Sequence, residues 1–383
     1  MEPDLLDITE ISESDWQPIR AQLEQTGLIQ VEYLSNITPS YLKFHPTLAP
    51  ALWLQVPAED QTTLETRHYK RYCQRSGYLC FEDNSNPYEA RAIVRRELPN
   101  LLAAVNRAVE ARYKDAVKFG NNVNWFLNVF SLRQDQELLT ARLEQIQGSI
   151  GSHSWYITRI NKGKMLLGAG YKEKSRVVFT ELLQELGEVP SYERCVTLEN
   201  IGRCLVAQGQ ATLAIEHYLT GIKDTEYLKQ YDAVKRQKGN LFSELGNVLT
   251  LTGDYIKAQI AYESALAIMK PLNALPSIAA TEGQLGTLAM RQGNLREAKT
   301  RYQSALATFQ SLEEPEREAV SLHLLGMVYQ EEKWWSKAEE CYREAARINE
   351  RAGNIAGAAG NWHQLAMMSH SLGRRETAIA YYE

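Results

Sequence analysis

Histidines are the residues of this chain that could most readily do chemistry near neutral pH. His45 lies in "YLKFHPTLAPAL" (residues 41–52), where a short alternating apolar run ends and Pro46 opens an amphipathic run. Proline suits the first turn of a helix because its missing N–H has no intrahelical partner there. From these residues alone, we expect His45 to cap that helix or to pack at the end of a strand.

A second group of histidines lies near the C-terminus. His363 and His370 are seven residues apart on one predicted helix face, and His323 is a candidate neighbour. This arrangement is compatible with a metal site, but no carboxylate or cysteine completes a ligand set at suitable spacing. We therefore expect no metal.

Catalytic and nucleotide-binding patterns do not stand out. No Ser/His/Asp, Cys/His or paired-carboxylate set lies at a predicted loop or helix end, so we expect the chain not to be an enzyme. No GxxxxGK[ST] loop is present, and "RINKGKM" has neither the first glycine nor the hydroxyl residue. The chain is thus expected to bind no cofactor by itself.

Composition describes an ordinary folded chain. Its 383 residues, 44% of them hydrophobic and 23% charged, are enough for two or three cores. The net charge of −5 is small and both signs are interspersed, which argues against a nucleic-acid partner. No run of about 18 apolar residues predicts a membrane span, and the acidic N-terminus is unlike a signal peptide, so we expect a cytoplasmic protein. Five cysteines without CxxC spacing indicate reduced, structural thiols.

A repeat organises the second half of the chain. Each copy starts at a small residue and has Gly or a substitute seven residues on, a small residue twelve on and an aromatic sixteen on. Successive anchors are 39, 44, 40, 40 and 40 residues apart: Gly163, Gly202, Gly246, Gly286, Gly326 and Ala366. A further copy near Asn124, with Trp125, Leu127 and Leu139, is supported by its spacing alone.

Each copy predicts two amphipathic helices joined by a tight turn that contains the second glycine. Small residues let the two backbones approach, and we expect the aromatic side chain to fill the space against the next unit. Such a pair cannot bury its apolar stripe alone, so the units must stack into a superhelix. The pattern, clearest in "ELGNVLTLTGDYIKAQIAYESALAI", resembles the tetratricopeptide repeat (TPR), in the long-helix variety of kinesin light chains. The predicted fold class is therefore all-α, a TPR superhelix over residues 155–383 with about six repeats.

The resemblance implies a binding groove. In TPR families the first helix of each unit lines the concave face, where side-chain amides can bind an extended peptide and Lys164 or Arg203 could hold a carboxylate. A protein or peptide is the leading expected ligand, and a merely solvated polar face is the alternative. The implied groove residues are Asn161, Lys164, Glu199, Asn200, Arg203, Asn240, Glu244, Asn247, Gln284, Thr287, Arg291, His323, Met327, Gln330, His363, Gln364, Met367 and His370.

The N-terminal segment has a different pattern. "SESDWQPIRAQLEQTG" predicts a short helix with a capping box at Ser14 and Gln17 and a stop at Gly27. "LIQVEYL" and "YLKF" alternate as two strands. Helix, strand, turn and strand predict half of a winged helix over residues 1–57, and residues 58–154 predict a helical bridge.

These segments also resemble a known family. "ITEISESDWQPIRAQLEQTGLIQ…YLKFHPTLAPALW" looks like the winged-helix segment of STAND proteins, signal-transduction ATPases with numerous domains, and "RRELPNLLAAVNRAVE" resembles the stretch that links it to TPR arms in bacterial members. The resemblance implies that His45 contacts the β-phosphate of ADP as a nucleotide-state sensor. Phe44 and Pro46 replace the neighbours of that histidine in the family motif, so packing remains an equal alternative.

Function follows from this organisation as a set of expectations. The leading one is a non-catalytic sensor and regulatory arm of a STAND ATPase, whose NTPase domain would precede this chain and bind ADP or ATP; both chain ends fall inside predicted modules, which suggests an excised fragment. The alternative is a free-standing TPR adaptor or signalling-peptide receptor. DNA binding is disfavoured because Arg20 is the only basic residue of "DWQPIRAQLEQ".

Overall fold

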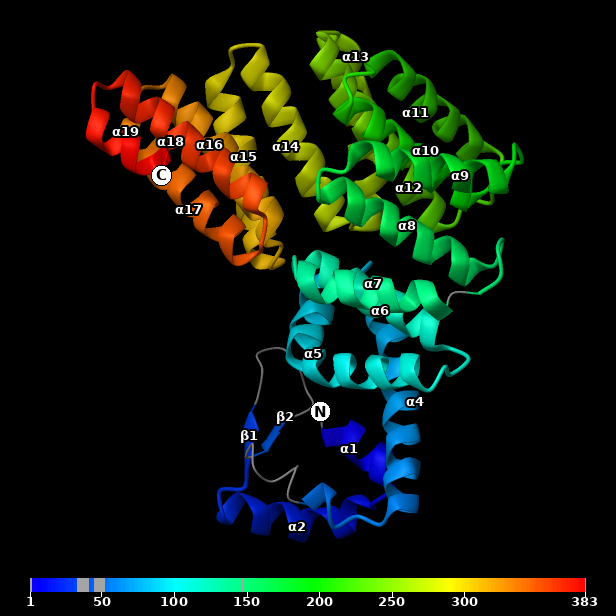
Figure 1. Ribbon diagram of the computed structural model, residues 1–383. Helices are drawn as coiled ribbons and strands as arrows, with labels where there is room; N and C mark the ends of the chain where they lie inside the picture. The colour runs from blue at the N-terminus through cyan, green and yellow to red at the C-terminus, as the bar shows by residue number, and fades with distance from the viewer. Residues whose placement is uncertain (1, 33–40, 45–51, 147, 383) are drawn as a thin grey trace. The chain divides into compact units, whose positions relative to one another are not determined.

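The computed structural model describes residues 2–32, 41–44, 52–146 and 148–382, and it confirms a mostly helical chain of stacked helix pairs with one small N-terminal hairpin (Figure 1). His45 and Pro46 lie outside the described residues. Two compact units, residues 1–126 and 127–383, are considered separately below. Among the described residues, no helix is both long enough and apolar enough to cross a membrane.

The first unit combines a strand pair with long helices. Its elements are α1 Glu2–Thr9, α2 Glu13–Gln25, β1 Ile29–Glu32, β2 Tyr41–Phe44, α4 Ala58–Glu82 and α5 Pro87–Glu110. β1 and β2 pair antiparallel, with Ile29 opposite Phe44 and Glu32 opposite Tyr41. The predicted short helix and two strands are thus confirmed, whereas the winged helix stays a prediction.

The cap of α2 differs from the prediction. Ser12, not Ser14, is the N-cap residue: its Oγ accepts a hydrogen bond from the backbone N–H of Asp15 and donates one to the Asp15 carboxylate. The predicted box at Ser14 and Gln17 is therefore wrong by two residues. The physical reason is that Asp15, three residues after Ser12, accepts a hydrogen bond from the cap hydroxyl with a charged carboxylate. The neutral amide of Gln17 would be a weaker acceptor for Ser14.

Hydrogen bonds to buried carboxylates fix α1 and α5 to α4. The buried Asp4 carboxylate accepts hydrogen bonds from Arg71 (2.7 Å) and Arg75 (2.6 Å). The Tyr72 hydroxyl donates to the buried Glu97 carboxylate at 2.7 Å. These hydrogen bonds let the two carboxylates enter the interior of the unit.

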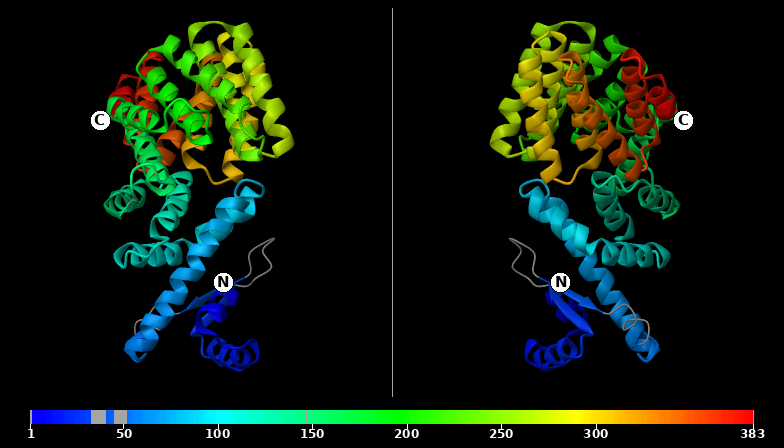
Figure 2. Two further views of the ribbon diagram at one scale, coloured as in Figure 1. Left: turned by 90° about the vertical axis from the view of Figure 1, so that its right-hand side faces the viewer. Right: turned by 90° about the vertical axis from the view of Figure 1, so that its left-hand side faces the viewer.

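α6 (Ala116–Val129) contains the boundary between the two units, and the second unit continues as a series of helix pairs. Figure 2 shows the pairs stacked side by side in a curved array. After α7 Arg133–Ile146 come α8 His153–Gly168, α9 Lys172–Leu186, α10 Tyr192–Ala207, α11 Ala211–Glu226, α12 Asp232–Thr252, α13 Tyr255–Met269, η1 Lys270–Leu272, α14 Leu275–Arg291, α15 Leu295–Ser311, α16 Pro315–Glu331, α17 Trp335–Arg351, α18 Ile355–Ser371 and α19 Arg375–Tyr382.

The repeat spacing positions the helix pairs as predicted. The turn glycine, for example Gly253 with φ +87°, ends the first helix in the left-handed conformation. The aromatic side chain, however, lies over its own repeat: a Cβ on Gly202 would be 2.3 Å from Cε1 of Tyr218. Tyr218 is fully buried. The anchor glycine therefore makes room for the ring of its own repeat, as well as for close helix packing.

First helices form the inner side of the curve. The first helices contact one another in series: α8 with α10, α10 with α12, α12 with α14, and α14 with α16. Second helices of neighbouring pairs, such as α9 and α11, do not contact each other as extensively in the described chain. An array whose first helices approach more closely than its second helices bends toward the first helices. The concave face is therefore formed by α8, α10, α12, α14 and α16.

Candidate binding groove

Four predicted groove residues form a charged row on three successive first helices. We call Lys164 of α8, Glu199 and Arg203 of α10, and Glu244 of α12 the charged row. The Arg203 Nε lies 3.6 Å from the Glu244 carboxylate, and the side chains are 44% and 20% exposed. Gln237 donates a hydrogen bond to Glu199 at 2.7 Å. These groups offer alternating charges along the inner face.

Partial burial shifts the charge balance of this row. Burial lowers the pKa of Lys164, and attraction by Glu199 offsets this only in part while Arg203 adds repulsion. Burial raises the pKa of Glu244, against the attraction of Arg203. Attraction by Glu244 raises the pKa of Arg203. Half-burial of Lys164 and Glu244 thus favours their neutral forms, while the neighbouring opposite charges favour the charged forms.

A buried hydroxyl lies close to the same charges. Burial raises the pKa of the Tyr218 hydroxyl, and Glu244 and Glu199 raise it further. This hydroxyl has no hydrogen-bond partner among the described residues. In later repeats the matching tyrosine hydroxyl bonds a side chain of its own first helix, Thr250 for Tyr262 at 3.3 Å. Val206 occupies the position of Thr250 in the repeat of Tyr218, which explains the difference.

Farther along the groove, several predicted residues are held by internal hydrogen bonds. Asn240 accepts from Ser277 at 3.2 Å, and Gln284 accepts from Ser243. Thr287 accepts from the Tyr302 hydroxyl at 2.9 Å. These bonds fix the side chains between helices, leaving less of their capacity for a ligand.

The C-terminal part of the predicted groove is divided in the same way. His323 is bonded to Asn361 at 2.9 Å, and Gln330 accepts from Tyr342 at 3.2 Å. His363 and His370 are exposed. No group of histidine, cysteine or acidic residues placed to bind a metal occurs in the described part of the chain. The remaining predicted groove residues are exposed or half-buried: Asn161, Asn247, Arg291, Met327, Gln364 and Met367.

One predicted residue does not face the groove. Asn200 is fully buried, and its side-chain amide donates to the backbone carbonyl of Val196 at 2.7 Å. We therefore leave Asn200 out of the site proposed below. The nucleotide contact predicted for His45 lies outside the described residues.

The structure adds groove residues that sequence reasoning missed. Arg133 of α7 donates from Nε to the Glu316 carboxylate of α16 at 3.0 Å, although the two are 183 residues apart. Arg317, the residue after Glu316, lies close enough to Glu244 for its charge to oppose the rise in the Glu244 pKa that burial causes. The curve of the superhelix brings these helices together, and no local pattern in the sequence signals such a contact.

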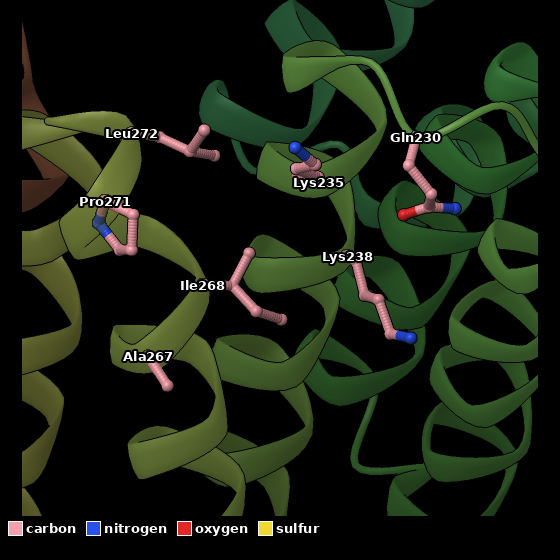
Figure 3. A pocket seen from close by; sticks show the side chains of 7 residues that line it. All are labelled: Gln230, Lys235, Lys238, Ala267, Ile268, Pro271 and Leu272. Atoms are coloured by element: carbon pink, nitrogen blue, oxygen red, sulfur yellow. The ribbon is translucent and has the colours of Figure 1, made fainter.

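Away from the charged row, a hollow lies at the start of α12 and the end of α13. Figure 3 shows Lys235, Lys238 and Gln230 on one side and apolar residues that include Ile268 and Leu272 on the other. These residues line a hollow of about 400 Å³. Each lysine already has a carboxylate partner: Asp232 at 3.8 Å and Glu226 at 3.3 Å. No unmatched charge marks this hollow as a binding site.

Comparison with known families identifies the repeats. Residues 277–351 and 359–383 match the tetratricopeptide repeat family. The TPR fold predicted from the spacing is therefore confirmed. No curated protein sequence is similar enough to the chain to count as a relative.

Solved structures of low sequence identity share the fold. A STAND protein with a tetratricopeptide repeat sensor from Pyrococcus horikoshii superposes with a TM-score of 0.54 at 13% identity, over 98% of this chain and 52% of that one. A Rap protein complexed with Competence and Sporulation Factor gives 0.52 at 14% identity, over 82% and 96%. The Rap conjugation gene regulator of plasmid pLS20, in complex with the Phr* peptide, gives 0.52 at 13%, over 74% and 83%. The chain thus spans about half of the STAND protein.

Proposed function

We propose that this TPR array binds an extended peptide or protein segment on its concave face, with the charged row as the centre of the site. The observation that carries this proposal is the position of Lys164, Glu199, Arg203 and Glu244 on adjacent first helices, where Arg203 is exposed, the other three are half-buried and the charges are only partly paired. A peptide offers backbone amides and charged side chains together, so it can satisfy a row of alternating charges. Support from outside the chain comes from two Rap structures of the same fold, one complexed with Competence and Sporulation Factor and the other with the Phr* peptide.

The test is selection of short peptides on the purified chain. A displayed library of random dodecapeptides should yield an enriched sequence whose affinity is then measured by calorimetry. Arg203→Ala and Glu244→Gln should each weaken binding by roughly tenfold or more, about 1.4 kcal/mol, because each leaves a ligand charge unmatched.

Lys257→Ala is the matched control. Lys257 lies on the second helix α13, is 71% exposed and pairs only with Asp254, so its loss should leave peptide affinity unchanged. Failure to enrich any peptide, or equal affinities for the groove and control variants, would contradict the proposal.

We further propose that the array is the sensor arm of a STAND ATPase whose NTPase domain lies upstream. The support is the resemblance of the N-terminal segment and the fold shared with a STAND sensor along nearly the whole chain. The natural reading frame should then yield a protein that carries ADP and releases it when the selected peptide binds. His45→Ala should lower the retained ADP, whereas His217→Ala, at a half-buried position on α11, should not. A natural protein without nucleotide in either state would favour the alternative, a free-standing peptide receptor.

A further inference from the structure

A small polar pocket lies beside the charged row, at the α7 end of the second unit. Its volume is about 50 Å³, and the residues that matter here are Ser131, Arg133, Gln136, Lys164 and Glu316. A single water needs about 10–15 Å³, so the pocket has room for a group the size of a carboxylate. Lys164 belongs both to this pocket and to the charged row.

The pocket lies where the repeat pattern is most divergent. Counting from Asn124 places Ser131 seven, Gln136 twelve and Thr140 sixteen residues on, where the later repeats carry Gly, a small residue and an aromatic. All three polar residues are buried, at 5%, 8% and 2% exposure. Burying polar groups is costly unless they are hydrogen-bonded, and the aromatic ring that fills this position in other repeats is replaced by threonine.

Ser131 has an unused hydroxyl. Its Oγ is buried without a hydrogen-bond partner among the described residues. Its backbone is held at φ +58°, in the left-handed region that glycine adopts in the matching turns. A buried, unpartnered donor in a strained turn is costly for the free protein, and a ligand that accepts from it would recover the lost hydrogen bond.

Lys164 is a cation in the same pocket that feels the attraction of Glu199 but has no close carboxylate partner among the described residues. It is half-buried and lines the pocket, and the described residues offer it no ion pair within 4.0 Å. Its helix neighbour Lys162, in contrast, pairs with Glu144 at 2.8 Å. A half-buried lysine without a close carboxylate partner attracts an anion more strongly than a paired one.

Arg133 provides a third hydrogen-bond donor to the pocket, and in this structure it donates to the Glu316 carboxylate. Its Nε–Glu316 bond is 3.0 Å long and a second nitrogen contacts the same carboxylate oxygen. The Glu316 side chain is 40% exposed, so it can move into water at little cost. An entering carboxylate could therefore replace Glu316 as the partner of Arg133.

We infer that this pocket binds a carboxylate of the groove ligand, which accepts from Ser131 and Lys164 and competes with Glu316 for Arg133. A carboxylate fits better than an ammonium group because the half-buried unmatched charge is positive, while the remaining acidic lining residue, Glu137, is exposed and hydrated. The inference rests on the proposed groove function for its ligand, and it also predicts binding of a simple carboxylate alone.

The first test uses N-acetylglycine and its amide, titrated by NMR into the purified chain. The acid should bind and the amide should not. Lys164→Met should weaken the acid by roughly tenfold or more, and Ser131→Ala by a few-fold. Glu316→Gln should instead strengthen it several-fold, because Arg133 then loses its competitor.

Lys162→Met is the matched control, since it removes a lysine from the same helix outside the pocket. It should leave the affinity for the acid unchanged. Circular dichroism establishes that each variant is folded. Equal binding of acid and amide, equal effects of the two lysine variants, or weaker binding by Glu316→Gln would each overturn the inference.

A second test separates a terminal from a side-chain carboxylate. The selected peptide is resynthesised with a C-terminal amide, or with its Asp and Glu residues changed one at a time to Asn and Gln. One of these peptides should lose affinity for the wild type but not for Lys164→Met. A peptide that needs Arg203 yet is indifferent to all these changes would leave the groove function standing and overturn the carboxylate site. If N-acetylglycine binds but no peptide can be selected, the carboxylate site would stand and the groove function would be overturned.

Discussion

Single residues decide how closely the two helices of a repeat approach. At Gly202, a Cβ would lie 2.3 Å from Cε1 and 2.6 Å from Cζ of Tyr218, a ring that is fully buried and has little space to move. Gly202→Ala should therefore lower the free energy of unfolding by about 1–3 kcal/mol, despite the better helix propensity of alanine. Urea unfolding followed by circular dichroism measures this change.

Gly360 provides the matched control on α18. No atom lies within 4 Å of its added Cβ, so Gly360→Ala should raise stability by about 0.5–1 kcal/mol through helix propensity alone. If Gly202→Ala proved as stable as Gly360→Ala, the close approach of helix and ring would not limit the packing of the repeat.

A second residue carries backbone strain at a turn. Lys333 has φ +62° at the position where other repeats have glycine. Lys333→Gly should raise the free energy of unfolding by about 0.5–1 kcal/mol, since the left-handed cost exceeds the extra entropy of glycine in the unfolded chain. Lys333→Ala keeps the strained backbone and should bring no gain; Gly293→Ala at the matching turn, where φ is +81°, should lower stability. A gain from Lys333→Ala equal to that from Lys333→Gly would assign the effect to the lysine side chain.

Between elements, the charged row couples α10 to α12 through the Glu244 carboxylate, whose pKa is raised by burial. Because the pKa of Glu244 is raised on folding, the native state binds this proton more tightly than the unfolded state. Its contribution to stability is thus complete below the ordinary glutamate pKa and is lost as pH rises through the raised value. Glu244→Gln should therefore gain stability relative to wild type between pH 4 and pH 8. Urea unfolding at both pH values checks the sign, and a relative loss would show that pairing with Arg203 outweighs burial.

Local patterns were enough to predict the helix pairs, but they could not predict how side chains are shared between helices. Gly253 and its equivalents mark the turns because a left-handed turn acts within a few residues. Repeat position also assigned Lys164, Glu199, Arg203 and Glu244 to first helices, and their role in binding stays a prediction. The burial of Asn200 and the bonding of Gln284 to Ser243 depend on the exact angle between helices, which sequence spacing does not encode.

At the scale of the whole second unit, stability should be unequal along the array. The largest apolar cluster runs from Trp155 of α8 to Leu288 of α14, whereas smaller clusters serve the later pairs. In a solenoid each pair is stabilised mainly by its neighbours, so opening can be local. Amide hydrogen exchange should be slowest in α10 to α13 and fastest in α19, with rates that differ by roughly tenfold or more. Uniform protection along the unit would mean that it opens as one cooperative body.

The same exchange experiment tests how a groove ligand acts on this array. A peptide that spans the charged row bridges α8, α10 and α12, and if its carboxylate displaces Glu316, it also frees α7 from α16. Bound peptide should therefore slow exchange in those three first helices while leaving the second helices α9 and α11 nearly unchanged, and should speed exchange at the start of α16. In Glu316→Gln the last effect should be missing, because the ion pair is already broken. Slower exchange at α16 on binding would instead mean that the ligand closes the array, and that Arg133 and Glu316 hold it together rather than exchange partners.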